Sequence, residues 1–137
     1  MNVVKVGGSV LREPGDFVKA AKNIRMLWVE KDIIPIVVVS AMKGITDRLI
    51  TASSGAIEEL DSVEQKYMEV ADELGSRSLA SRVSHEVERI REILEESSHD
   101  ELLKDYVVSL GERLSRIAMV QALEIEGVKA FEVNAAD

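Results

Sequence analysis

The chain has 137 residues, of which 46% are hydrophobic; it carries a formal net charge of -8 and contains no cysteine. This length suffices for one globular core and is too short for two comfortable domains, and the lack of cysteine excludes disulfides and thiolate metal sites. The acidic balance argues against nucleic acid or an anionic membrane as a partner, because both need a basic face. Because the sequence shows no apolar membrane-spanning stretch and no secretory leader, we expect a cytoplasmic protein.

The charge is unevenly distributed along the sequence. Lysine and arginine outnumber aspartate and glutamate by eight to five in residues 1–50, whereas the acidic residues lead by twenty to nine in residues 51–137. We therefore expect any anion-binding site in the first fifty residues. The same split is equally typical of solvated surface helices in the second part.

The first stretch, V-V-K-V-G-G-S-V-L at 3–11, predicts a strand over 2–6 that runs into a glycine turn. A strand followed by such a turn and a helix is the usual layout of a phosphate-binding loop, in which Lys5 would supply the counter-charge. Neither the Walker pattern nor the dinucleotide pattern fits, because the lysine precedes the glycine pair. A tight turn with a solvated lysine is the alternative interpretation.

The next elements predict a strand–helix–strand unit. Apolar residues at helical spacing indicate an amphipathic helix over 16–32 with Asp16 as N-cap, and the run I-I-P-I-V-V-V predicts a strand over 33–40, buried on both faces. The two strands would be parallel, so the loop S-A-M-K-G-I-T-D would lie beside the glycine turn, at the sheet edge where ligands bind in open α/β sheets.

The remainder of the chain is expected to be mainly helical. Helices are predicted over about 47–59, with Thr46 and Asp47 as caps, and over 61–74, 78–97 and 100–126, followed by a short strand over 128–133. Gly111, inside the last helix, would cost about 1 kcal/mol relative to alanine. It either allows close packing or gives a ligand access beside Glu112. His85 and His99 are isolated, so we interpret them as surface residues and expect no metal site.

Three separated stretches together resemble the N-terminal part of aspartate kinases of the amino-acid kinase superfamily. They are K-V-G-G-S-V at 5–10, V-V-V-S-A-M-K-G-I-T-D-R-L at 37–49 and S-L-G-E-R-L-S at 109–115. The long helical stretch at 53–105 also resembles aspartate kinases and is longer than in acetylglutamate or uridylate kinases. The resemblance covers essentially the whole chain.

This resemblance implies a three-layer αβα amino-acid-kinase fold with a mostly parallel sheet and a helical insert at 53–105. The first loop reads G-G-S-V-L, one polar residue shorter than in many members. Residues 1–137 contain no motif for the family's arginine that binds the aspartate carboxylate, its catalytic aspartate, its base pocket or its ACT domains. We therefore expect an incomplete domain, the N-terminal portion of a kinase domain, that is inactive alone.

The resemblance also implies transfer of the γ-phosphoryl group of ATP to the side-chain carboxylate of aspartate, the first step toward lysine, threonine and methionine. Mg would be held mainly by the nucleotide. The residues implied on the phosphate side are Lys5, as the catalytic counter-charge, with Gly7, Gly8 and Ser9 around the phosphates. Those implied for aspartate are Ser40, Ala41 and Thr46, with Glu112 as acceptor for the ammonium group.

Two alternatives remain open. The first is a non-catalytic interaction module, a pseudo-subunit that contributes helices to a partner chain. The second is another amino-acid kinase, which the length of the insert disfavours. Three predicted strands are too few for the large sheet of the implied fold. We therefore expect exposed apolar surface and a homodimer or higher oligomer.

Overall fold

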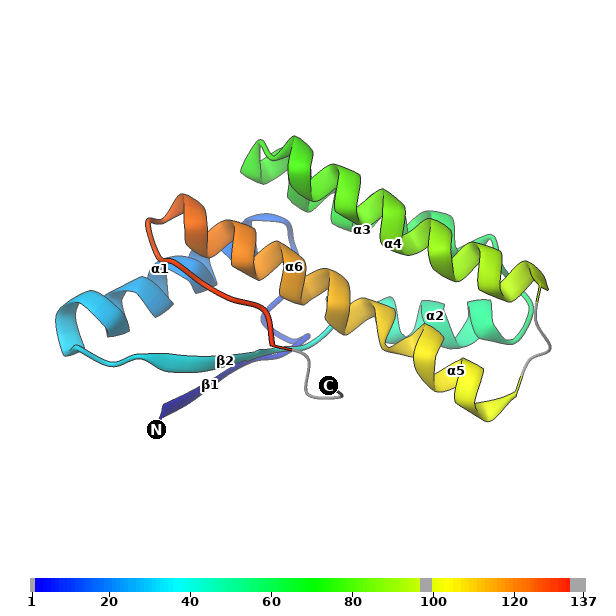
Figure 1. Ribbon diagram of the computed structural model, residues 1–137, viewed down its shortest axis with the longest axis horizontal. Helices are drawn as coiled ribbons and strands as arrows, with labels where there is room; N and C mark the ends of the chain where they lie inside the picture. Colours follow the sequence, from blue (N-terminus) through cyan, green and yellow to red (C-terminus); the bar gives the residue numbers. More distant parts are fainter. Residues whose placement is uncertain (1, 97–99, 134–137) are drawn as a thin grey trace.

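The computed structural model describes residues 2–96 and 100–133. These residues form two strands and six helices (Figure 1). One helix lies between the two strands in the sequence, and the other five helices follow the second strand. In chain order they are β1 (Asn2–Val6), α1 (Gly15–Lys31), β2 (Pro35–Val39), α2 (Ile45–Ser53), α3 (Glu59–Leu74), α4 (Arg77–Glu96), α5 (Glu101–Val108) and α6 (Leu110–Ile125).

The sheet consists of β1 and β2 in parallel, joined by the crossover helix α1. The register pairs Asn2 with Pro35 and continues to Val6 with Val39, so the carboxyl ends of both strands lie at the same edge. The predicted strand–helix–strand unit is confirmed, and so is the α/β class. Valine side chains alternate along strands because successive residues point to opposite faces.

Only one face of this sheet is covered by the helices of the described residues. Val4 and Val6 of β1 and Val37 and Val39 of β2 pack against the core, to which α1 and α6 contribute. On the opposite face the apolar side chains are exposed, Val3 by 54%, Ile36 by 46% and Val38 by 48%. The prediction that the second strand is buried on both faces was therefore wrong for this chain.

Helices α3 and α4 form a long hairpin that lies against α6. Gly75 ends α3 in the left-handed region, with φ of 61°, and its N–H donates to the carbonyl groups of Ala71 and Asp72. Each helix of the hairpin carries a buried apolar stripe at helical spacing. The stripes consist of Leu60, Val63, Tyr67 and Val70 on α3 and Leu79, Val83, Val87, Ile90 and Leu94 on α4.

The predicted helix caps were wrong. Helix α1 begins at Gly15, ahead of the predicted cap Asp16. The Asp16 carboxylate instead accepts the N–H groups of Glu13 and Arg12, at 2.8 and 2.9 Å, and these bonds, chiefly that from Glu13, lower its pKa. Helix α2 begins at Ile45 after Gly44, whose φ is 85°, and the predicted caps Thr46 and Asp47 lie within its first turn.

The single helix expected over 100–126 is two helices that meet at Ser109. The Ser109 hydroxyl donates to the Tyr106 carbonyl at 2.6 Å and accepts a hydrogen bond from Arg113 at 2.8 Å. The interruption is confined to this residue, because the Ser109 N–H still donates to the Asp105 carbonyl and the Ser109 carbonyl still accepts the Arg113 N–H. Helix α2 is likewise shorter than expected, since Ser53 and Ser54 both donate to the Ile50 carbonyl where it ends.

Residues 128–133 do not form the predicted strand. After Gly127, with φ of 82°, the Val128 N–H turns back to donate to the Leu123 carbonyl, and β2 pairs only with β1 among the described residues. The segment is held through side chains instead. Glu132 forms ion pairs with Arg82 of α4 and Arg116 of α6, with N–O distances of 2.8 and 3.4 Å.

Within the described ranges, no helix combines the length and apolar character needed to cross a lipid bilayer.

Candidate active site

The first loop follows β1 at the carboxyl edge of the sheet. The Gly7 carbonyl accepts the N–H groups of Val10 and Leu11, at 3.0 and 3.1 Å, which closes the loop into a tight turn. A side chain at Gly8 would place its Cβ 3.1 Å from the Ala41 carbonyl oxygen, in the loop after β2. The Gly8 and Ser9 N–H groups have no acceptor within the described part of the chain and are free to bind an anion.

The second loop, at residues 40–44, is tied to the first by backbone hydrogen bonds. The Ser40 N–H donates to the Val6 carbonyl and the Lys43 N–H to the Leu11 carbonyl, both at 3.0 Å. Ala41 is buried in this loop, whereas Ser40 is exposed. The glycine turn and the S-A-M-K-G loop therefore form one surface, as the parallel strands predicted.

The start of α6 packs directly against the second loop. A Cβ at Gly111 would lie 2.6 Å from the Ala41 Cβ and 3.1 Å from Ile45 Cγ2, so only glycine fits. Of the two roles considered for Gly111, close packing is what the structure shows. Glu112 is exposed and lines an open cavity of about 1170 Å³ together with Val38 and Val39 of β2.

Tyr67 of α3 joins the second loop to α6 through its buried hydroxyl. That oxygen accepts the Met42 N–H at 2.9 Å, donates toward the Gly111 carbonyl at 3.1 Å and lies 2.7 Å from Ser115 Oγ. Burial raises the Tyr67 pKa to about 12. Our sequence interpretation missed this residue. The signal was present, since a tyrosine on the apolar stripe of a helix needs a buried partner for its hydroxyl.

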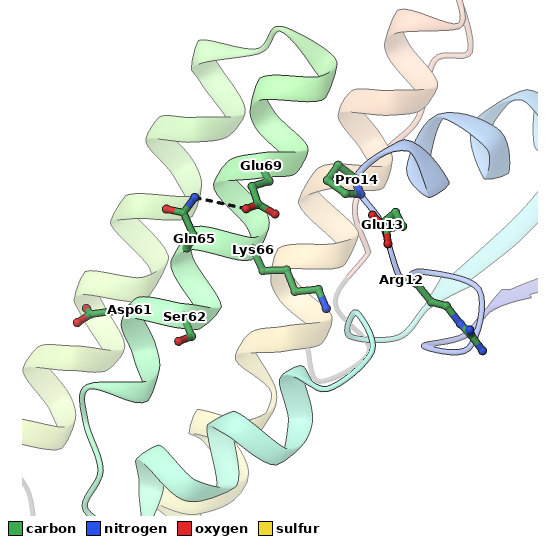
Figure 2. A pocket seen from close by; sticks show the side chains of 8 residues that line it. All are labelled: Arg12, Glu13, Pro14, Asp61, Ser62, Gln65, Lys66 and Glu69. Atoms are coloured by element: carbon green, nitrogen blue, oxygen red, sulfur yellow. Dashed lines mark hydrogen bonds between the residues drawn. The ribbon is translucent and has the colours of Figure 1, made fainter.

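Charged side chains hold the outer backbone of both loops. Lys66 Nζ donates to the Lys43 carbonyl at 2.8 Å, and Arg12 Nε donates to the Ser9 carbonyl at 3.0 Å. Lys66 and Arg12 also line a surface groove of about 530 Å³ between the first loop and α3. Figure 2 shows the Lys66 side chain extending from α3 toward the loop side of this groove, which Glu13 and Glu69 also border.

The structure gathers some of the site residues expected from the sequence more closely than others. Gly8 and Ala41 are in contact, and Ala41 also meets Gly111, the neighbour of Glu112. No hydrogen bond joins two of the eight site residues within the described ranges. Five of them are exposed, namely Lys5, Ser9, Ser40, Thr46 and Glu112. Lys5 lies beside Val38 on the open face of the sheet, two residues before the glycine pair.

The histidines and the acidic residues do not form a metal site in the described part of the chain. No group of three or more histidine, aspartate or glutamate side chains there is placed to hold a metal ion. His85 is exposed on α4, and the sequence expectation for His99 falls outside the described residues.

The fold and the three converging motifs agree with the comparison to known proteins. The model of the amino acid kinase family matches residues 1–137, and the chain belongs to that family. Escherichia coli aspartokinase III in complex with aspartate and ADP superposes with a TM-score of 0.82 at 23% identity, covering 96% of this chain and 30% of the solved chain. The same enzyme in complex with lysine and aspartate gives 0.76 at 24% identity, covering 94% of this chain and 30% of the solved one.

A third solved structure extends the similarity to another organism. Clostridium acetobutylicum aspartate kinase gives a TM-score of 0.69 at 23% identity, covering 90% of this chain and 29% of the solved one. The chain thus spans about 30% of the length of these structures, and at this identity the similarity establishes the amino-acid-kinase fold. No curated protein sequence matches the chain.

Proposed function

We propose that this chain forms the phosphate-binding and aspartate-binding side of an aspartate kinase active site. In this reaction a carboxylate oxygen of aspartate attacks the γ-phosphorus of ATP, the bond to the β–γ bridging oxygen breaks, and ADP leaves. The observation that carries the proposal is the contact of Gly111 with Ala41. It places the helix that bears Glu112 directly against the S-A-M-K-G loop, beside the glycine turn.

On the phosphate side, the proposal assigns the transferring phosphoryl group to the glycine turn. The N–H groups of Gly8 and Ser9 have no acceptor among the described residues, and the Gly7 carbonyl closes the turn by accepting the N–H groups of Val10 and Leu11. Lys5 would compensate the negative charge that moves during transfer. Phosphoryl transfer depends on positioning and charge compensation more than on covalent chemistry, so a lysine beside backbone amides suits it.

On the aspartate side, Ser40, Ala41 and Thr46 would surround the substrate, and Glu112 would accept its ammonium group. Glu112 borders an open cavity lined in part by apolar residues of β2, and its carboxylate can accept charge-assisted hydrogen bonds from an ammonium group there. Aspartate is the ligand named for two of the solved relatives, and ADP for one. These matches support aspartate over other acceptors for this fold.

Mg would enter with the nucleotide. The described residues offer no cluster of carboxylates or histidines that could hold the ion, whereas ATP carries its own phosphate oxygens as ligands. The glycine turn fits such a bound nucleotide, because it offers backbone amides rather than metal ligands, and Lys5 lies in the preceding strand, two residues before the glycine pair. In the cell the product would feed lysine, threonine and methionine synthesis in the cytoplasm.

The experiment is a reconstitution assay, because the chain spans about 30% of the matched solved chains. The purified chain is assayed for aspartate-dependent ADP release alone and after addition of a separately expressed segment that supplies the rest of an aspartate kinase. The acyl phosphate is trapped with hydroxylamine. We expect no turnover from the 137-residue chain alone. The mixture should form aspartate hydroxamate, and a mixture made with the Lys5→Ala chain should not.

A second candidate is an interaction module without catalysis, and the open apolar face of the sheet favours it. It predicts that the added segment binds the chain while the Lys5→Ala variant behaves like the wild type. A different amino-acid kinase would give product with another carboxylate substrate and none with aspartate. Either result would contradict the proposed function.

A further inference from the structure

We propose that Tyr67 is a positioning residue that sets the spacing of the two halves of the aspartate pocket, an inference that rests on the proposed function. Its hydroxyl contacts Met42, the residue after Ala41, and Gly111, the residue before Glu112. One atom of the helical insert thereby connects the loop on one side of the pocket with the helix on the other.

The three hydrogen bonds of this hydroxyl can form together. The oxygen accepts the Met42 N–H, and its single proton goes either to the Gly111 carbonyl or to Ser115 Oγ. If Gly111 receives it, the Ser115 hydroxyl donates back to Tyr67. The hydroxyl can reach Met42 in the second loop and both Gly111 and Ser115 in α6 only while the loop and the helix keep their present distance from each other.

The network is insulated from solvent. Tyr67 and Ser115 are both fully buried, and the Met42 side chain is 1% exposed. Water therefore cannot replace the tyrosine hydroxyl without a rearrangement of the core, and an unmet buried N–H is costly. Without the hydroxyl the Met42 N–H has no acceptor, and we expect the second loop to shift relative to α6.

The adjacent residue of α3 acts on the same loop. Lys66 Nζ holds the Lys43 carbonyl while Tyr67 holds the Met42 N–H, so consecutive residues of α3 fix consecutive residues of the loop. The first loop shares two backbone hydrogen bonds with the second loop, and it is held besides by bonds within its own backbone and by Arg12, none of which involves Tyr67. Tyr67 should therefore affect aspartate binding and leave nucleotide binding nearly unchanged.

The test compares Tyr67→Phe with Val63→Ala in the 137-residue chain. Phenylalanine removes only the hydroxyl, whereas Val63→Ala opens the core one turn earlier on α3, where Val63 is fully buried, and leaves all three hydrogen bonds of the hydroxyl in place. Dissociation constants for aspartate and for Mg–ATP are measured by titration of amide resonances, and both variants are melted. We expect Tyr67→Phe to weaken aspartate binding by roughly five- to tenfold. Its ATP constant should stay within twofold, and Val63→Ala should change neither constant.

Three other outcomes would overturn the inference. If Tyr67→Phe binds aspartate as the wild type does, or weakens both ligands equally, the residue is structural only, and the proposed function stands. If Val63→Ala weakens aspartate binding as much, general destabilisation explains the effect. If the wild-type chain binds ATP and no aspartate, the proposed function fails first and this inference falls with it.

Discussion

Gly111 and Ala41 meet so closely that a Cβ on the glycine would stand 2.6 Å from the Cβ of the alanine. This contact joins two sequence motifs about seventy residues apart. It explains why α6 carries a glycine in its first turn, and it fixes the position of Glu112 relative to the second loop.

Gly111→Ala should lower the free energy of unfolding by about 1–3 kcal/mol, the usual cost of forcing a methyl group into a packed core. Gly15→Ala is the matched control, because its Cβ would find only Glu73 Oε1, at 3.7 Å. Urea denaturation of both variants measures the difference. Equal stability of the two would show that the loop and α6 are not packed as described.

Alkaline pH should destabilise the fold through Tyr67. Burial raises its pKa to about 12, above the value near 10 of an unfolded tyrosine, so the folded state holds the proton more tightly. The stabilisation is complete below pH about 10 and is lost as the pH rises toward 12. Over that window the wild type should lose about 2–3 kcal/mol more than Tyr67→Phe in denaturation experiments. Parallel curves for the two proteins would contradict the burial of the hydroxyl.

Lys5→Ala should lower turnover in the reconstituted enzyme by roughly ten- to hundredfold, with little change in the Michaelis constant for aspartate. The reason is that its charge acts mainly while the phosphoryl group transfers. Lys22→Ala removes another exposed lysine, on α1, and should be neutral. Steady-state kinetics decide between the two roles of Lys5, since an unchanged turnover rate would leave it a solvated lysine beside a turn.

Glu112→Gln should weaken aspartate binding about tenfold while the melting temperature stays nearly constant. The substitution keeps the shape of the side chain and removes only its charge. Glu124→Gln, on the exposed end of the same helix, is the control. A lower melting temperature with unchanged affinity would make Glu112 a structural residue.

The open face of the sheet should drive self-association. Val3, Ile36 and Val38 expose apolar surface there, and β2 has an unpaired edge among the described residues. We expect an oligomer in sedimentation at micromolar concentration, reduced by Ile36→Lys. Leu102→Lys alters a more exposed apolar side chain on α5, at 83%, and should have no effect. A wild-type chain that sediments as a monomer would contradict this prediction.

The sequence predicted the local elements well where a single pattern decided them. The valine runs and the amphipathic spacing located β1, α1, β2 and the α3–α4 hairpin to within a few residues. The break at Ser109 was missed because it is confined to a single residue, whose hydroxyl bonds to Tyr106 and Arg113 while helical backbone bonds continue on both sides. The alternation at 128–133 predicts a strand, but the Val128 N–H turns back to the Leu123 carbonyl and Glu132 forms ion pairs with Arg82 and Arg116 instead of pairing with β2.

For the candidate site, the motifs indicated which loops meet and not how they are held. Because β1 and β2 are parallel, the loops that follow them, with Gly8 and Ala41, lie at the same edge of the sheet, and the sequence predicts this. Tyr67 was missed because its role depends on packing between α3, the second loop and α6. Its partners Met42 and Gly111 are far from it in the sequence. For the same reason the sequence alone does not decide between close packing and ligand access at Gly111.

A map of amide chemical shifts shows whether the two loops and the start of α6 bind ATP and aspartate. The isotopically labelled chain is titrated with Mg–ATP and, separately, with aspartate, using glutamate as a control. We predict that ATP shifts the amides of Gly7, Gly8 and Ser9, and that aspartate but not glutamate shifts those of Ser40, Ala41, Thr46 and Glu112. Shifts confined to the helical hairpin, or no shifts at millimolar ligand, would contradict the account.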